Sequence, residues 1–442
     1  MIDKRTIYAM EPMLPSKLDK ELEDLAFKLI SKSNILTNQL HQITLDSIGD
    51  LVRSMNCYYS NLIEGHNTHP IDIERALNGD YSQNIEKRNL QLEAFAHIEV
   101  QRLINNNLLE DSCPGTIAKP ASIVSADYLS LIHRHFYERL PKELQWVEDP
   151  KTKKKLKVNP GKLRQRDVQV GLYVGTIAKR TSSRLRRTND RSALGVHEDH
   201  EDDENAEIGV WLQSHIACSA DKLPLFISRF EEAYDLNKLS KLQQLIAVGA
   251  SHHRLLWIHP FLDGNGRVAR LFSHAFLRNL GIGNSLWSVS RGLARRATDY
   301  KRLLMEADAL RKGDLDGRGN LSERALVDFC KFFLEISIDQ IDFMAKLLNL
   351  NSLLERVSDH INLEIQKGHL PKGSYALLKE ALITGSFERG LAAELTGYKE
   401  RQARTVLSTL LNKGLLYSEH SRAKVRIAFP VSVLDKWFPG LY

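Results

Sequence analysis

The stretch WIHPFLDGNGRVARLF, from Trp257 to Phe272, is the most informative part of the 442-residue sequence. His259 has a side chain whose ordinary pKa of about 6.5 suits proton abstraction near neutral pH. Asp263 offers a hard oxygen ligand, and Mg²⁺ in proteins typically takes one or two carboxylates together with the phosphates of a substrate. The first half of the stretch therefore predicts a base beside a magnesium ligand.

The second half of the stretch predicts a place for phosphate groups. Gly264 and Gly266 flank Asn265 and let the backbone approach a ligand with its N–H groups directed at it. The helix expected to start here adds the positive end of its dipole. Arg267 and Arg270 are three residues apart, so both lie on one helix face and can reach the same polyphosphate. Each feature alone is common in proteins, whereas their joint occurrence at this spacing favours a nucleotide site.

Outside this stretch, apolar residues recur at helical spacing and predict a mainly helical chain. The expected helices are Leu18 to Leu36, Ile43 to Ile63, Ile71 to Leu77, Asn89 to Asn105, Ser125 to Leu140, Leu223 to Tyr234, Leu239 to Leu256, Arg267 to Leu280, Ala297 to Lys312 and Ser322 to Leu348. Residues from Pro141 to about Ala220 are charged and interrupted by glycines. We expect loops there, with a β-hairpin within VQVGLYVGTIA (168–178).

The last part of the chain, from about residue 352 to 442, predicts a winged helix-turn-helix. Two helical segments meet at a Thr-Gly turn (396–397), and the segment LLYSEHSRAKVRIAF alternates well enough to form a two-stranded wing. Lys399, Arg401 and Arg404 lie on the second helix. DNA binding needs several cations on one face, and winged helices also dock proteins, so the sequence leaves both kinds of partner open.

Composition and charge limit the class of protein. The formal net charge is +6, and no apolar run approaches the length of about 20 residues that a membrane helix needs. The N-terminus lacks the apolar core of a secretory signal, and the four cysteines lack the paired spacing of a zinc site or a disulfide framework. We therefore expect a cytoplasmic protein outside the membrane. The basic segment 151–191 and the acidic segment 198–207 fit solvated loops, with a nucleic-acid patch as the alternative for the basic one.

The stretch around the histidine resembles the signature of the Fic family, HPFx[DE]GNGRxxR. All nine defined positions are present: His259, Pro260, Phe261, Asp263, Gly264, Asn265, Gly266, Arg267 and Arg270. The resemblance extends over about residues 120–345, where it includes GKLR (161–164) and Tyr300 in a later helix.

The resemblance implies a mainly α fold with three parts. A helical Fic core at 116–348 carries a small β-hairpin flap. An N-terminal helical region at 1–115 includes an inhibitory helix at about 43–65. The winged helix-turn-helix, an α+β unit, follows at 352–442.

The same resemblance implies a protein adenylyltransferase, which is a nucleotidyltransferase that moves AMP from ATP to a Ser, Thr or Tyr hydroxyl of a target protein or of itself and releases pyrophosphate. His259 would take the hydroxyl proton, and Asp263 would hold Mg²⁺ between the α- and β-phosphates. The residues expected to bind ATP and its phosphates are Gly264, Asn265, Gly266, Arg267, Arg270 and Tyr300. The GNGR form favours AMP transfer over the phosphorylation of the related Doc branch, whereas phosphocholine and UMP transfer stay open.

Two other activities stay open as well. In one, the Fic core senses nucleotide and the winged helix binds DNA, which would make the chain a transcription regulator. In the other, the same site removes AMP from modified proteins, with Glu64 orienting a water molecule. The expected partners are therefore ATP, a protein with a hydroxyl side chain, DNA under the first alternative, and a second copy of the chain if it forms a homodimer.

A second short stretch, SNLIEGHN (60–67), comes at the end of an expected helix. Gly65 suits a helix C-terminus because glycine takes a positive φ readily. Ser60, Glu64 and Gly65 match the pattern [ST]xxxE[GN] of the inhibitory helix in Fic proteins. The guanidinium of Arg270 can pair with a γ-phosphate or with a carboxylate. We therefore expect Glu64 to pair with Arg270 and to misplace ATP, so that the enzyme is autoinhibited.

One region departs from the family pattern. Between GKLR and the signature, Fic proteins have a short hairpin flap that aligns the backbone of the target. In this sequence the region is expanded and charged from Lys179 to Ala220. We assign the flap to His215 to Ala217.

Overall fold

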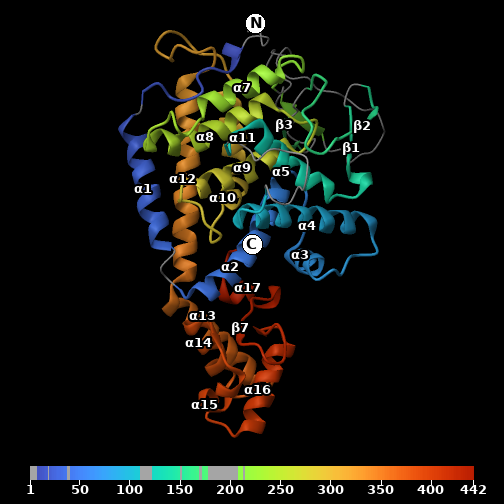
Figure 1. Ribbon diagram of the computed structural model, residues 1–442, viewed down its shortest axis with the longest axis vertical. Helices are drawn as coiled ribbons and strands as arrows, with labels where there is room; N and C mark the ends of the chain where they lie inside the picture. The colour runs from blue at the N-terminus through green and yellow to red at the C-terminus, as the bar shows by residue number, and fades with distance from the viewer. Residues whose placement is uncertain are drawn as a thin grey trace.

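The computed structural model describes residues 7–17, 19–36, 40–109, 122–149, 152–168, 172–177, 208–212 and 215–442. Within these residues the protein is mainly helical, as predicted, and its strands are short. The helices form a large body with a smaller C-terminal part at one end (Figure 1). The long helix α12 (Glu323–Leu348) runs along the body toward that part. None of the helices in these ranges is both long and apolar enough to cross a membrane.

The N-terminal region is helical. Its elements are the 3-10 helix η1 (Ile7–Met10), α1 (Lys20–Leu36), α2 (Gln42–Ile63), α3 (Pro70–Leu77) and α4 (Ile85–Asn105). Helix α1 packs along α12 at one side of the body (Figure 1). Helix α2 begins after His41, whose Nδ1 accepts a hydrogen bond from the backbone N–H of Ile43. It ends at Glu64, and Gly65 follows with φ +86°, the left-handed conformation that glycine adopts without strain.

The central body contains the stretch from which the sequence analysis started. Its elements are α5 (Ala126–Glu138), the 3-10 helix η2 (Lys142–Leu144), β1 (Trp146–Glu148), β2 (Lys155–Lys157), β3 (Leu172–Ile177), β4 (Ile208–Leu212), α7 (Leu223–Ala233), α8 (Lys241–Ile258), α9 (Asn265–Asn279), α10 (Val289–Arg295), α11 (Ala297–Ala307) and α12. Helices α8 and α9 pack against each other, and most of their side chains are buried. The signature loop between them is therefore mounted on the most enclosed pair of helices in the body.

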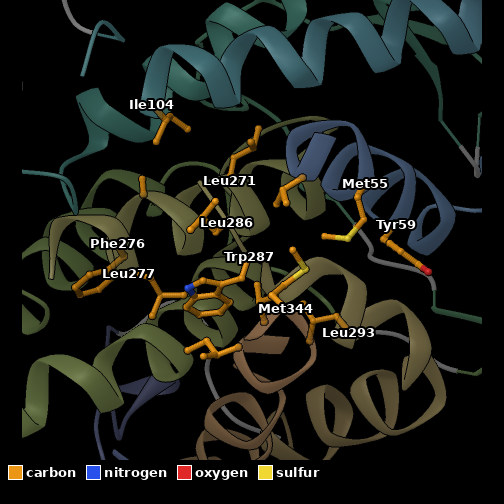
Figure 2. Close-up of a cluster of buried hydrophobic side chains, with 14 of the residues drawn as sticks. Met55, Tyr59, Ile104, Leu271, Phe276, Leu277, Leu286, Trp287, Leu293 and Met344 are labelled. Atoms are coloured by element: carbon orange, nitrogen blue, oxygen red, sulfur yellow. The ribbon is translucent and has the colours of Figure 1, made fainter. Parts of the chain in front are cut away.

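The hydrophobic core joins the N-terminal region to the body. Figure 2 shows the cluster around Trp287, a side chain that is 2% exposed. Side chains from α2, α4, α9, α10 and α12 surround it; those labelled are Met55, Tyr59, Ile104, Leu271, Phe276, Leu277, Leu286, Leu293 and Met344. Helix α2 is thus part of the main core rather than an appendage to it.

Two short antiparallel hairpins are present where the sequence predicted one. The prediction of a hairpin within 168–178 is wrong, because β3 pairs with β4 across the charged segment of the sequence. The second hairpin, β1–β2, was not predicted and pairs Trp146 with Lys157. The alternation of residues located β3 correctly, but it carries no information on a partner that lies some 30 residues further along. Residues 178–207 themselves lie outside the described ranges.

The C-terminal part combines helices with a small sheet. Its elements are α13 (Leu350–Gln366), α14 (Ser374–Thr384), β5 (Ser386–Phe387), the 3-10 helix η4 (Arg389–Leu391), α15 (Ala392–Thr396), α16 (Glu400–Asn412), β6 (Leu416–Tyr417), β7 (Val425–Ile427) and α17 (Val431–Trp437). The strands form an antiparallel sheet in the order β5-β7-β6. Gly397, with φ +69°, makes the predicted turn before α16. The assignment of this part as a winged helix stays a prediction.

The C-terminal part contacts the N-terminal region directly. The Thr44 hydroxyl at the start of α2 donates a hydrogen bond to the carbonyl oxygen of Leu382 at 3.2 Å. The backbone N–H of Val431 donates to a carboxylate oxygen of Glu74 in α3 at 2.9 Å. Helices α2 and α3 therefore connect the body with the C-terminal part.

Candidate active site

His259 lies immediately after α8 and has an uncommon backbone conformation. It is the C-cap of the helix, with φ 53° and ψ 63°, in the left-handed region that non-glycine residues rarely occupy. Its N–H still donates to the carbonyl oxygen of Leu255 at 3.0 Å. Pro260 follows, and a proline cannot continue the helical hydrogen bonding. The local sequence thus stops the helix at His259 and turns this residue out of it.

The surroundings of His259 keep its imidazole neutral. Burial, followed by the neighbouring His215 and the charge of Arg164, lowers the pKa of His259 to about 4. The imidazole ring is therefore in its base form at neutral pH, as proton abstraction from a hydroxyl requires. Its Nδ1 is buried and makes no hydrogen bond to any residue that the structure describes.

The loop after His259 is held by Asn265 and Gly264. The Asn265 side chain accepts a hydrogen bond from the Phe261 N–H at 2.9 Å and donates one to the Phe261 carbonyl at 2.8 Å. Gly264 has φ +76°, and a Cβ at this position would come within 2.8 Å of the Tyr137 ring. The Asn265 side chain is thus used within the loop, which leaves its backbone N–H for a ligand.

The first turn of α9 has the properties of an anion site. The N–H groups at the start of a helix have no partner within the helix, and the helix dipole places partial positive charge there. Gly266 lies in this turn and contributes no side chain of its own over the backbone. The role of this turn as a cradle for phosphates stays a prediction.

Asp263 is oriented by a neighbouring tyrosine. The Tyr137 hydroxyl donates to Oδ2 of Asp263 at 2.6 Å. Burial and the Asp263 carboxylate raise the pKa of Tyr137, so this hydroxyl stays a donor. Oδ1 accepts no hydrogen bond from the described part of the chain, which leaves one hard oxygen for a cation. One carboxylate with a free oxygen beside a phosphate cradle fits the way Mg²⁺ binds together with a nucleotide.

Glu64 from the end of α2 reaches into this site and binds Arg270. The Arg270 NH2 group lies 2.5 Å from Oε1 of Glu64, and its Nε donates to the Ser60 hydroxyl at 2.8 Å. Burial alone would raise the pKa of Glu64, but the charges of Arg270 and Arg267 lower it to about 2. The fold thus brings Arg270 to Ser60 and Glu64, as predicted, although Arg270 lies more than 200 positions after them in the sequence.

The carboxylate of Glu64 lies over the anion site as well. A Cβ built on Gly266 would be 2.4 Å from Oε1 of Glu64. The carboxylate therefore occupies the space above the first turn of α9, in contact with the guanidinium of Arg270. A phosphate group and Glu64 cannot occupy this position together.

Glu93 is a member of the site that the sequence analysis missed. It lies in α4, is 6% exposed, and forms a short ion pair with Arg267. Its other oxygen is 3.0 Å from Nδ1 of His66, two residues after Glu64. The sequence does contain a hint of it, because Glu93 stands within the mostly apolar helical run LQLEAFAHI. A carboxylate on a buried helix face needs a charged partner, so this position indicates a buried ion pair. The partner lies 174 positions away and is not readable from that pattern.

Two further predicted residues lie at the edge of the site. Tyr300 is 3% exposed, and its hydroxyl is 2.7 Å from Nε2 of His252 in α8. It also interacts with Arg270. His215, the start of the assigned flap, follows β4 and has its Nε2 2.6 Å from the Trp257 carbonyl oxygen. It is thereby placed beside His259.

Comparison with known proteins finds similarity over the part of the chain that contains this site. Residues 123–277 match the family described as Fic/DOC. The protein adenylyltransferase Fic of Drosophila erecta is 35% identical over 72 residues, which cover 16% of this chain and 14% of that protein. The protein of the same name from Drosophila melanogaster is 33% identical over 91 residues, or 21% of this chain and 18% of that protein. The matches thus span less than one-fifth of the length of these relatives.

Solved structures of Fic proteins are also similar to this chain. The crystal structure of a Fic family protein from Desulfovibrio desulfuricans G20 is 15% identical, with 94% of this chain and 98% of that chain covered and a TM-score of 0.46. Fic-1 from C. elegans is 14% identical, with 75% and 73% covered and a TM-score of 0.43.

Proposed function

We propose that the chain transfers AMP from ATP to a hydroxyl side chain of a target protein or of itself, and the match of residues 123–277 to the Fic/DOC family supports this proposal. The hydroxyl oxygen attacks the α-phosphorus in line with the bond to the β-phosphate. A P–O bond forms, the α–β bridging bond breaks, and pyrophosphate leaves. Positioning and charge stabilisation supply most of the catalysis in a reaction of this kind.

The residues of the site have distinct roles in this proposal. His259 takes the proton of the attacking hydroxyl, which its low pKa permits at neutral pH. The backbone N–H groups at the start of α9 bind phosphate oxygens, and Arg267 and Arg270 offset the charge of the β- and γ-phosphates. Asp263 would hold Mg²⁺, which when bound supplies positive charge to the phosphates and the leaving pyrophosphate.

The observation that carries the proposal of autoinhibition is the position of Glu64. Its carboxylate pairs with Arg270 and covers Gly266, the two groups expected to receive the γ-phosphate and a neighbouring phosphate oxygen. ATP that binds beside Glu64 loses the Arg270 contact, so its α-phosphorus is misaligned for attack. A displacement of about 1 Å can reduce a rate about 100-fold.

Labelled ATP tests both proposals. We expect Glu64→Gly to raise self-labelling about 10- to 100-fold, because the cradle and Arg270 become available to ATP. Adding His259→Ala to this variant should abolish the label, and mass spectrometry should show the mass of AMP on a Ser, Thr or Tyr. A correctly folded Glu64→Gly protein that transfers nothing to itself or to lysate proteins would overturn the proposed transfer. Release of AMP from a modified protein would instead indicate the reverse activity.

The C-terminal part supports a second candidate function, a DNA-binding regulator that senses nucleotide. Arg401 and Arg404 in α16 and the N-cap residue Lys399 are exposed, and the described residues provide no ion-pair partner for them. Duplex DNA should then bind with an affinity that falls with salt, and replacing Arg401 or Arg404 should reduce the slope by about one. An unchanged salt dependence would leave α16 as a surface for protein partners.

A further inference from the structure

Arg164, the last residue of the GKLR stretch, is a buried arginine bound by backbone oxygens rather than by a carboxylate. It is 4% exposed, and it forms no ion pair within the ranges that the structure covers. Its guanidinium donates to the carbonyl oxygens of His259 at 2.7 Å, Arg166 at 2.9 Å, Cys218 at 2.5 Å and Ile258 at 3.3 Å. Its backbone N–H donates to the carbonyl oxygen of Pro260 at 2.9 Å. Three consecutive carbonyl groups around the proposed base are therefore bound by one residue.

These contacts determine the backbone conformation of His259. The Ile258 carbonyl belongs to the peptide plane before His259, and the His259 carbonyl belongs to the plane after it. The angle between these planes is set by φ and ψ of His259, so a rigid guanidinium that binds both planes limits both angles. A left-handed conformation in a non-glycine residue costs energy and persists only where the surroundings impose it. The contacts of Arg164 with the carbonyl groups on both sides of His259 supply such surroundings.

The same guanidinium has an electrostatic reason to be there. The last carbonyl groups of α8 have no partner within the helix and carry the negative end of its dipole. A buried cation is favourable at this end, which explains how Arg164 remains buried without a carboxylate. The contact with the Cys218 carbonyl also joins the segment that contains His215, a neighbour of His259.

We propose that Arg164 is a positioning residue that holds His259 in the conformation from which it reaches the target hydroxyl. The inference rests on the proposed function, since a base needs this placement and a purely structural histidine does not. A lysine cannot replace Arg164, because one ammonium group cannot bind the separate carbonyls that the planar guanidinium reaches from three nitrogens.

The chain offers a matched control in Arg254. This residue lies in α8, is fully buried, and donates to the carbonyl oxygen of Pro12 from Nε at 3.1 Å and from NH2 at 2.8 Å. NH1 of Arg254 also contacts Nδ1 of His253 at 2.7 Å and the Ala307 carbonyl oxygen at 3.4 Å. Arg254 is thus as buried as Arg164 and donates mainly to carbonyl oxygens, but its guanidinium binds the N-terminal segment instead of the signature loop. Any general cost of replacing a buried arginine should appear in both variants.

The experiment compares Arg164→Lys and Arg254→Lys in the Glu64→Gly background. We expect Arg164→Lys to lower kcat for self-labelling about 100-fold while KM for ATP changes less than about twofold, because the phosphate-binding groups are untouched. Arg254→Lys should lose similar thermal stability and keep its kcat. Equal losses of kcat in the two variants, or a higher KM with unchanged kcat for Arg164→Lys, would overturn the inference. If Arg164→Lys does not fold, Arg164→Gln, which keeps a planar donor, is measured in its place.

A second readout does not depend on activity. In histidine-labelled protein, the NMR signal of His259, assigned by its loss in His259→Ala, should shift or broaden in Arg164→Lys and stay in place in Arg254→Lys. An unchanged signal in both variants would contradict the inference. If Glu64→Gly transfers no AMP, the proposed function fails, while the NMR comparison still decides whether Arg164 places the imidazole.

Discussion

At the scale of single residues, the two arginines of α9 differ in the carboxylates that they bind. Arg270 pairs with Glu64, whose side chain is 31% exposed, whereas Arg267 pairs with Glu93, whose side chain is 8% exposed. A phosphate can replace a partly exposed carboxylate, because water solvates the carboxylate once it has left the arginine. A buried carboxylate that leaves its arginine loses the ion pair that offsets its lost hydration, so it stays in place. We therefore regard Glu64 as the replaceable partner and Glu93 as a permanent one.

The missing side chain of Gly266 provides a residue-scale prediction. A methyl group there would cover the backbone of the cradle, so Gly266→Ala in the Glu64→Gly background should reduce self-labelling at least about 100-fold. Gly390→Ala is the control, because a Cβ at that position meets nothing within 4 Å. Circular dichroism verifies the fold of both variants. Retained labelling in Gly266→Ala would show that phosphates do not approach this turn.

The low pKa of His259 predicts the pH dependence of the reaction. Only the neutral imidazole can accept a proton, and a pKa of about 4 keeps it neutral at all pH values well above 4. Initial rates of self-labelling by Glu64→Gly should therefore be flat between about pH 5.5 and pH 8 as far as this residue is concerned. A decline centred near pH 6.5, the ordinary value for histidine, would contradict the burial of the ring and its cationic neighbour.

At the scale of elements, the turn after α2 is attached to the signature helix at two points. Glu64 binds Arg270, and two residues later His66 binds Glu93, which itself binds Arg267. The hydrogen bond to Glu93 raises the pKa of His66, and the charge of Glu64 raises it further. Burial and the charge of Arg267 lower this pKa, but the net shift is upward. Protonated His66 thus stabilises the same turn that carries the proposed inhibitory carboxylate.

This raised pKa predicts a pH-dependent contribution to stability. The stabilising contribution of protonated His66 is fully present below about pH 6.5, the ordinary pKa of histidine. It is lost as the pH rises through the higher pKa that His66 has in the folded state. The difference in free energy of unfolding between the natural chain and His66→Gln should therefore be largest near pH 6 and vanish near pH 9. Denaturant titrations at several pH values measure it. A difference that grows with pH would have the wrong sign for an ion pair with Glu93.

The elements that sequence could predict are those defined by local patterns. Helical periodicity located α2 and α9 within two residues, and the turn glycines Gly65 and Gly397 were identified because few other residues tolerate a positive φ. The pairing of β3 with β4 and the seven-residue helix α10 were missed, because strand partners and short buried helices depend on distant contacts.

The same limit applies to the site. The nine signature positions and Glu64 were found because each belongs to a short pattern with a definite chemistry. Glu93 and the contacts of Arg164 were not found. A carboxylate in α4 and an arginine in a loop can be recognised as parts of the site only when the fold brings the first to α9 and the second to the end of α8.

At the scale of the whole molecule, the body and the C-terminal part have separate aromatic centres. Trp287 is buried in the body, and Trp437 in α17 is fully buried with its indole N–H donating to His360 at 3.0 Å. The two parts meet through α2, α3, the end of α12 and the C-terminal tail, where the Gly440 carbonyl oxygen accepts a hydrogen bond from Arg291 in α10. We predict that, once destabilised, the C-terminal part unfolds before the body does.

Trp437→Ala tests that independence. Removing a fully buried tryptophan should cost about 3–5 kcal/mol, all of it in the C-terminal part. Calorimetry should then show an early transition that the natural chain lacks, and Glu64→Gly with this change should keep its labelling rate within about twofold at temperatures below that transition. Trp146→Ala, which alters an exposed tryptophan, is the control. One shifted transition with loss of labelling would mean that the two parts form a single cooperative unit.

The burial of α2 limits how the proposed autoinhibition could be released. Leu45, Ile48, Val52, Met55 and Tyr59 are all buried, and exposing side chains of this size costs about 1.5–3 kcal/mol each, so withdrawing the helix would require on the order of 10 kcal/mol. Rotating the Glu64 side chain breaks one ion pair. An activator therefore needs only a modest preference for the state in which this carboxylate has turned away. Under the proposed function, nucleotide itself or a docked target would supply such a preference, and activation would be a graded response at one side chain instead of a rearrangement of the protein.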